Sequence, residues 1–112
     1  MASRATKFKA VNVAESLAIG GGTAFTKLVK YTPTIDPASV AANTTAEQTF
    51  TVTGLTTVDI VLCVIKPTAT AGLGIVGFRV SAANTLAITY VNATAAGIDA
   101  ASEVYTVIAL RS

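Results

Sequence analysis

The side chains that could do chemistry in this sequence are few, and their spacing forms no recognisable catalytic or metal-binding motif. There is no histidine, and the six acidic residues stand at least four positions apart. Histidine is the commonest general base, metal ligand and partner of a nucleophile. A carboxylate pair or metal cluster would therefore need chance convergence of distant acids. We predict a protein that is not an enzyme, with no catalytic residues, no metal site and no cofactor.

Two further features resemble functional sites only superficially. Residues 72–77 (GLGIVG) match the G-x-G-x-x-G phosphate pattern, but the apolar sequence continues to Val80 as a strand and does not open a helix whose N-terminus could meet a phosphate. The single cysteine, Cys63, lies inside the apolar run 60–65, so an intramolecular disulfide is impossible and a buried thiol is expected. Neither feature changes the prediction.

Charge divides the chain into two parts near residue 30. Residues 1–30 carry five cations and one acid, a formal charge of +4, whereas residues 31–112 carry three cations and five acids, a formal charge of −2. The basic part has no sustained helical or strand period, and its three glycines at 20–22 read as a hinge. We expect an extended basic N-terminal arm over 1–30, which could contribute a first strand from residue 26, and a β-sandwich domain over 31–112.

The elements after the arm have the alternation and turn residues of strands. Residues 58–66 are almost continuously apolar, which predicts a core strand covered on both faces. A hairpin is expected with Val76, Phe78 and Val80 on one face and a five-residue linker, 81–85, whose Asn84 adopts the left-handed conformation. The fold class predicted is all-β: an antiparallel β-sandwich of jelly-roll or Greek-key type. The predicted strands are 26–31, 48–53, 58–66, 74–81, 86–92 and 103–111, with a weaker one near 39–42.

The basic arm allows several interpretations. Its cations are too dilute and its aromatic residues too few for a nucleic-acid tail, and it lacks the amphipathic helix of a membrane-surface segment. An arm that docks on an acidic protein surface and a solvated tail both remain open. Only 12% of the residues are charged, well below the ~25% of an ordinary soluble domain, and such a neutral surface suits permanent contact with protein.

Three segments carry a resemblance to a known class of proteins: residues 72–92 (GLGIVGFRVSAANTLAITYVN), residues 102–107 (SEVYTV) and residues 49–55 (TFTVTGL). They resemble small structural proteins of tailed bacteriophages, most of all capsid decoration (cement) proteins. The resemblance implies a protein made in the host bacterial cytoplasm and located on the capsid surface of the virion. It also implies binding to the major capsid protein as a homo-oligomer, with a trimer favoured. From the composition of the arm we expect contact with neither nucleic acid nor membrane.

On this hypothesis the arm holds the capsid-contact residues, with cations that meet acidic capsid patches and apolar side chains that anchor them. The candidates are Arg4, Lys7, Phe8, Lys9, Leu17, Ile19, Lys27 and Lys30. The alternative is a head-fibre or tail-fibre attachment module that binds host glycan. A glycan site usually needs an exposed aromatic platform, for which only Tyr31, Tyr90 and Tyr105 are available.

Overall fold

The computed structural model describes residues 9–112, and within them every paired strand runs antiparallel to its neighbours and no helix forms. This confirms the prediction of an all-β, antiparallel chain. The described part of the chain contains the strands β1 (Lys27–Tyr31), β2 (Thr34–Ile35), β3 (Thr44–Thr51), β4 (Ile60–Ile65), β5 (Leu73–Ala82), β6 (Thr85–Asn92), β7 (Glu103–Val104) and β8 (Thr106–Arg111).

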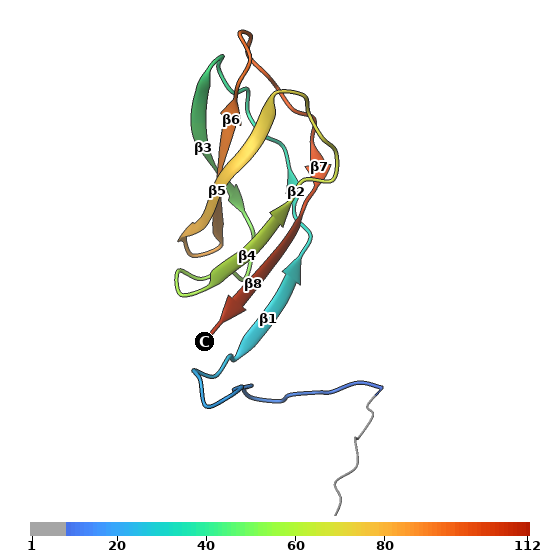
Figure 1. The fold of residues 1–112 in the computed structure, drawn as a ribbon, viewed down its shortest axis with the longest axis vertical. Coiled ribbons are helices and arrows are strands. Elements are labelled where there is room, and N and C mark those ends of the chain that lie inside the picture. Colours follow the sequence, from blue (N-terminus) through green and yellow to red (C-terminus); the bar gives the residue numbers. More distant parts are fainter. Residues whose placement is uncertain (1–8) are drawn as a thin grey trace, which may run out of the picture.

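Within residues 9–112 the strands form two three-stranded sheets and one short two-stranded ladder (Figure 1). The first sheet has the order β1-β8-β4 and the second β3-β6-β5. The ladder, β2-β7, follows the β1-β8 pairing after a break at Pro33, whose carbonyl accepts a hydrogen bond from the Tyr105 N–H at 2.9 Å. Proline has no N–H to donate to a ladder, which explains why the pairing is interrupted there.

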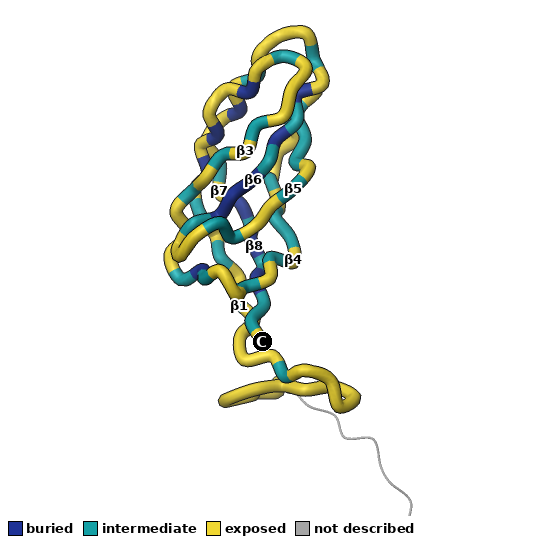
Figure 2. The backbone as a smooth tube through the Cα atoms, turned by 90° about the vertical axis from the view of Figure 1, so that its left-hand side faces the viewer, coloured by how far each residue is buried: buried dark blue, intermediate teal, exposed yellow. Residues whose placement is uncertain are grey.

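One hydrophobic core draws side chains from both three-stranded sheets. Its centre comes from the middle strands, with Leu86 and Ile88 on β6 and Val107 and Ala109 on β8 (Figure 2). Residues 105, 107 and 109 all point into this core, as the two-residue alternation of a strand requires. That strand is nevertheless split into β7 and β8 at Tyr105.

Two buried tyrosines join the sheets at the core. The hydroxyls of Tyr90 and Tyr105 lie 3.1 Å apart in a hydrogen bond, and both side chains are inaccessible to solvent. The bond gives each phenol a polar partner that the core otherwise lacks. Burial raises the pKa of the Tyr90 phenol, and its hydrogen bond with Tyr105 adds to the shift. The Tyr90 phenol therefore stays neutral at physiological pH.

The predicted hairpin is present as β5 and β6, with a shorter turn than expected. Ala82 pairs with Thr85, so the turn is residues 83–84 and the five-residue linker was wrong. Asn84 has a φ of 58°, which confirms its left-handed conformation. Its side-chain oxygen accepts a hydrogen bond from the Gly54 N–H at 2.8 Å and so ties this turn to the connection between β3 and β4.

A β-bulge breaks the face predicted for β5. The register shifts between Ile75 and Gly77, so Val76 is the extra residue and leaves the alternation. Its side chain is 61% exposed, whereas Val80 packs against the core. The prediction that Val76, Phe78 and Val80 share one face was therefore wrong for Val76.

The apolar strand β4 is an edge strand and not the core strand predicted from its composition. It pairs only with β8, and a bulge between Val61 and Cys63 interrupts the pairing. Val61 and Val64 pack against the core, whereas Ile60, Leu62 and Ile65 are exposed. The run is apolar on both faces, but the fold covers only one of them.

Smaller differences concern the first half of the chain. β3 begins four residues earlier than the predicted strand at 48–53 and ends two residues earlier. The weak strand near 39–42 is a single bridge between Val40 and Ile98, and β2 was not predicted.

Candidate docking surface

The described part of the arm, residues 9–26, leads into β1 and folds back on itself in a small loop. Leu17 and Phe25 form an antiparallel bridge with N···O distances of 2.8 and 2.7 Å. The glycines predicted as a hinge make the turn, since Gly20 and Gly21 have φ values of 62° and 73° and the Gly22 N–H bonds to the Ile19 carbonyl at 3.2 Å. Two successive positive φ values are those of a type I′ turn.

The arm is exposed to solvent along almost all of its described length (Figure 2), and several of its exposed residues are apolar. Among the predicted contact residues, Ile19 is 76% exposed at the turn and Leu17 is 46% exposed at the bridge. Three more apolar side chains of the arm are similarly exposed: Val11, Val13 and Phe25. A tail that stays in solvent gains no stability from exposed apolar side chains. Their exposure is typical of a segment that binds another surface.

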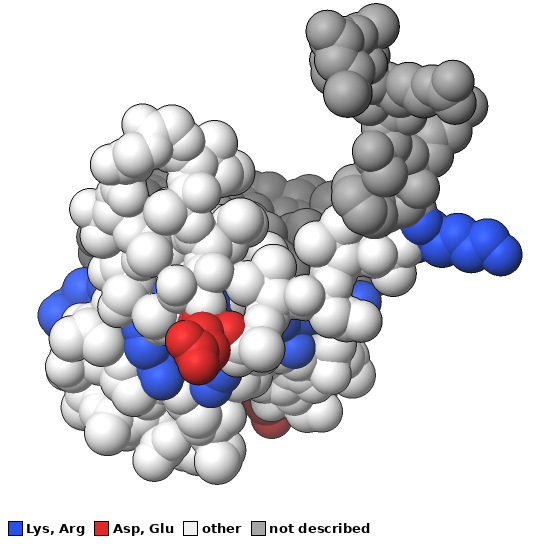
Figure 3. Space-filling model, turned by 90° about the horizontal axis from the view of Figure 1, so that it is seen from below, with Lys and Arg blue, Asp and Glu red and all other residues white. Residues whose placement is uncertain are grey.

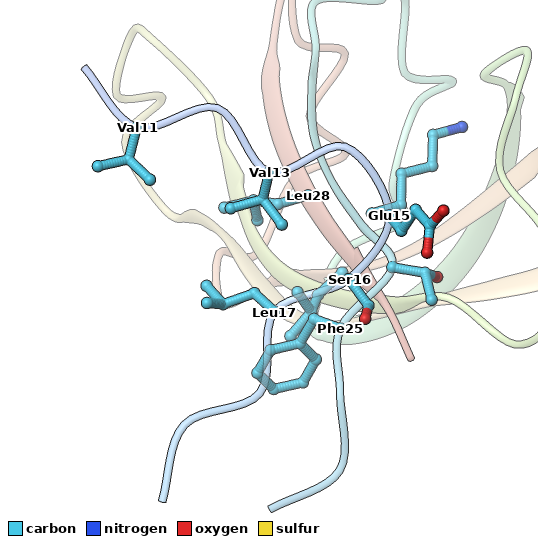
Figure 4. A pocket seen from close by; sticks show the side chains of 10 residues that line it. Val11, Val13, Glu15, Ser16, Leu17, Phe25 and Leu28 are labelled. Carbon is cyan, nitrogen blue, oxygen red and sulfur yellow. The ribbon is translucent and has the colours of Figure 1, made fainter.

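The arm and the first sheet enclose an apolar hollow of about 380 Å³ (Figure 4). We call it the arm hollow. Its floor includes Leu28 of β1 and Leu110 of β8, and the arm supplies its wall. The apolar wall residues are Val11, Val13, Leu17 and Phe25, and Glu15 and Lys27 bring opposite charges to the same hollow.

The lysines near the arm differ from the cations of the rest of the protein. Lys66, Arg79 and Arg111 each form an ion pair, with Glu103, Glu47 and Asp59 respectively. Within residues 9–112, Lys9, Lys27 and Lys30 are exposed and form no ion pair.

Seen from the arm end, the surface is mostly uncharged, with basic side chains set around a small acidic patch (Figure 3).

The predicted contact residues fall in three places. Lys9 lies at the start of the described chain, and Leu17 and Ile19 lie in the arm loop. Lys27 and Lys30 lie on β1, an edge strand of the first sheet. Arg4, Lys7 and Phe8 lie outside the described residues.

The sequence did not reveal a second apolar surface, the side of the β1-β8-β4 sheet that faces away from the core. The register aligns Leu28, Leu110 and Ile60 in one row across the three strands. Leu28 is 68% exposed and Ile60 55%. We call this surface the outer face; its apolar residues are Leu28, Ile60, Leu62, Ile65, Ile108 and Leu110. The register also places Lys30 and Cys63 on this side of the sheet, opposite Ile108. The sequence feature that could have indicated this surface is the apolar run 60–65, which the sequence analysis assigns to a strand buried on both sides.

Other candidate sites give no sign of chemistry. Residues 9–112 contain no group of three or more His, Cys, Asp or Glu side chains placed to hold a metal ion, and no helix that could span a bilayer. Gly72 lies in the turn directly before β5, and the chain continues from Leu73 as a strand, as expected, and not as a phosphate-binding helix. Tyr90 and Tyr105 are fully buried and Tyr31 packs against the core, so they do not form the exposed platform that a glycan site requires.

Comparison with known proteins adds no relative: no protein-family model, no curated protein and no solved structure matches this chain.

Proposed function

We propose that this protein is a capsid decoration, or cement, protein of a tailed bacteriophage. It binds the outer surface of the major capsid protein shell and stabilises the contacts between capsid subunits. The observation that carries the proposal is the contrast among the cations of residues 9–112: the three that lie beyond residue 31 are in ion pairs, and the three at the arm end have no acidic partner. The sequence resemblance described above supplies the class of partner.

The arm end combines the two kinds of contact that docking on protein requires. Lys9, Lys27 and Lys30 supply unpaired charge, and Leu17 and Ile19 supply exposed apolar area. Each exposed ion pair contributes only about 0.2–1 kcal/mol. Several copies joined in one oligomer and held on one lattice gain affinity through multivalency, and the resemblance to decoration proteins favours a homotrimer.

We also propose that the fold belongs to the β-sandwich class, of the jelly-roll kind. Two features support this: both three-stranded sheets contribute to one core, and the strand pairing follows a wrapping order. Among the long strands the first, β1, pairs with the last, β8, and the second, β3, pairs with β6, which precedes β8. This order arises when the chain folds back on itself as one long antiparallel hairpin and the hairpin then winds into two packed sheets.

A truncation tests the proposed role directly. Deletion of residues 1–22 removes the arm loop and Lys9 but leaves β1 and every later strand intact, since β1 begins at Lys27. We expect the truncated protein to keep its far-UV circular dichroism and to lose occupancy on purified capsids, measured by cosedimentation and electron microscopy. Unchanged occupancy would refute the arm as the docking element.

A charge-matched pair of variants separates specific contact from a general loss of positive charge. Lys27→Gln with Lys30→Gln removes two unpaired lysines from β1. Arg79→Gln with Lys66→Gln removes two cations that already have acidic partners within the protein. The first variant should weaken capsid binding more than the second, and equal losses would show that only net charge matters.

A further inference from the structure

The four outer strands of the two three-stranded sheets differ in what lies along their free edges. β4 and β5 lie side by side, so the margins of the two sheets meet there (Figure 1). β3 is held to a neighbouring segment, because the side-chain amide of Gln48 exchanges two hydrogen bonds of 2.8 Å with the main chain of Ala38. Within residues 9–112, β1 pairs with β8 alone, and no bridge forms along its other edge. The edge of β1 is therefore open to a further strand.

The main-chain groups that point to this open edge follow from the register. The register that joins β1 to β8 continues without a shift into the β2-β7 ladder, and at the break between them the Tyr105 N–H donates to the Pro33 carbonyl at 2.9 Å. Antiparallel strands bond to each other at every second residue. The residues of β1 at odd distances from Pro33, Leu28 and Lys30, therefore direct their N–H and C=O groups away from β8. They offer two donors and two acceptors to an added strand.

The side chains beside this edge set the chemistry of a strand that fits it. Leu28 and Lys30 project from the side of the sheet that bears the outer face, and Leu28 lies in the floor of the arm hollow. Lys27 and Val29 project from the opposite side. Cross-strand neighbours interact on the same side of a sheet, so an added strand places one side chain beside each of these four. The two lysines are exposed and form no ion pair, so they favour acidic neighbours, whereas Leu28 and Val29 favour apolar ones.

The same lysines disfavour a second copy of β1 as the added strand. Pairing of two β1 edges would bring four lysines into one ladder, since each copy contributes Lys27 and Lys30. Like charges that face each other across a ladder are destabilising, and lysine on an edge strand is a common protection against self-association. An acidic strand replaces this repulsion with attraction, so the charges at the edge discriminate between a copy and an acidic partner.

We propose that the open edge of β1 binds an extended segment of a partner protein as an added antiparallel strand. The segment has the pattern acidic, apolar, apolar, acidic, opposite residues 30, 29, 28 and 27 in that order. Main-chain hydrogen bonds hold the segment, and the arm hollow receives the apolar side chain opposite Leu28. This deepens the proposed function by stating the chemistry of the capsid segment, and it rests on that function only for the identity of the partner. A strand of five residues spans only roughly 17 Å, so firm attachment requires many copies on one lattice.

Nuclear magnetic resonance titration of the full chain with a synthetic peptide tests the added strand. The probe is the end-capped peptide TEVIET, which has the proposed pattern, and the control is TKVIKT, in which lysine replaces both acids. TEVIET should cause saturable chemical-shift changes at the amides of β1 and slow the hydrogen exchange of the Leu28 and Lys30 N–H groups. The Val29 and Tyr31 N–H groups should be protected with and without peptide, because they face β8. No saturable change up to the solubility limit of TEVIET, changes centred away from β1, or equal binding of TKVIKT would overturn the proposal.

A pair of substitutions at one residue separates the main-chain bond from the charge. Lys30→Gln removes the ammonium group and keeps the N–H, whereas Lys30→Pro removes both. The Lys30 N–H points away from β8, so proline leaves the existing ladder intact. Lys30→Pro should weaken TEVIET binding more than Lys30→Gln, and equal losses would overturn the proposal.

Leu28→Ser gives a second measurement that does not depend on how the fold tolerates proline. This side chain is 68% exposed, so its replacement should leave the fold intact, as far-UV circular dichroism would show. It should weaken TEVIET binding, and an unchanged affinity would overturn the proposal. Occupancy on purified capsids tests the proposed function separately. Wild-type protein that binds TEVIET but no capsid would contradict the proposed function and support the added strand, and capsid binding without peptide binding would do the reverse.

Discussion

Arg111 at the end of β8 and Asp59 just before β4 form a two-point ion pair, with Nε 2.5 Å from Oδ1 and Nη2 2.9 Å from Oδ2. The Thr56 N–H donates a further hydrogen bond to Oδ2 at 2.9 Å. Together these bonds fix the start of the edge strand β4 against the middle strand β8. The hydrogen bond from Arg111 is the main cause that lowers the pKa of Asp59 from 3.8 to about 2.

This pair predicts a dependence of stability on pH. A carboxyl group with a lowered pKa in the folded state stabilises the fold above its unfolded pKa, and the contribution is lost as the pH falls from about 4 towards 2. We expect Asp59→Asn to lower the free energy of unfolding by about 1.5–3 kcal/mol at pH 7 and to flatten the acid limb of the stability curve. Urea denaturation at several pH values measures both effects.

Glu47→Gln is the matched control for this prediction. The Arg79 hydrogen bond also lowers the pKa of Glu47, but that pair is exposed, with 63% and 40% of the two side chains accessible. Exposed pairs contribute little, so the control should change the stability much less. Equal effects of the two substitutions would contradict the role assigned to the buried carboxylate.

The tyrosine pair predicts a coupled loss of stability. Tyr90→Phe removes one hydroxyl and leaves that of Tyr105 buried without its partner. We expect a loss of about 1–3 kcal/mol in the free energy of unfolding. Replacement of both tyrosines by Phe should cost less than the sum of the two single changes, because no polar group is then stranded. Strict additivity in this double-mutant cycle would show that the hydroxyls do not interact.

Replacement of Asn92 should lower the free energy of unfolding further, because its fully buried amide uses all of its hydrogen-bonding capacity. Its Nδ2 donates to the Val40 and Ala96 carbonyls at 2.9 and 2.8 Å, and its Oδ1 accepts from the N–H and hydroxyl of Thr94 at 2.9 and 2.8 Å. Asn92→Ala leaves these groups unpaired and should cost about 2–4 kcal/mol. Asn43→Ala, at an exposed turn, is the comparison, although the φ of 53° there will add a small strain of its own. A smaller loss for Asn92 than for Asn43 would contradict the prediction.

A side chain added at Gly72 should clash with Thr94, and a second substitution at Thr94 should relieve the clash. Its φ is +80°, and a Cβ added there would lie 2.2 Å from Cγ2 of Thr94, whose hydroxyl is held by Asn92 and Ala96. Gly72→Ala should lower the thermal midpoint, whereas Gly77→Ala, with 3.8 Å to its nearest neighbour, should change it little. Addition of Thr94→Ser removes the clashing methyl and should recover part of the loss. If the thermal midpoint does not recover, the whole effect of Gly72→Ala comes from the backbone conformation at residue 72.

Several parts of the fold could be predicted because their signals are local. The alternation of residues 105–109, the β5–β6 hairpin and the left-handed Asn84 all depend on neighbours in the sequence. The position of β4 could not be predicted, because an apolar run does not show whether its second face meets the core or remains open. The bulge at Val76 depends on cross-strand register, which the sequence pattern of one strand does not contain.

The candidate docking surface likewise has some features that the sequence predicts and others that only the tertiary structure provides. The basic segment was visible from charge counts alone, and its lysines on β1 followed from a strand predicted one residue too early. That the cations beyond residue 31 are in ion pairs could not be foreseen, because Lys66 and Glu103 or Arg79 and Glu47 stand far apart in the chain. The outer face also depends on strand order, which only the tertiary structure provides.

The place of β8 between β1 and β4 has a consequence for synthesis on the ribosome. β1 (residues 27–31) and β4 (residues 60–65) emerge early but share no hydrogen-bonded ladder, since both pair with residues 106–111. During translation both strands must wait, with their apolar side chains uncovered, until the joining segment leaves the exit tunnel. Such distant pairing slows folding, and a nascent chain in this state is a natural client for chaperones that shield unpaired strands.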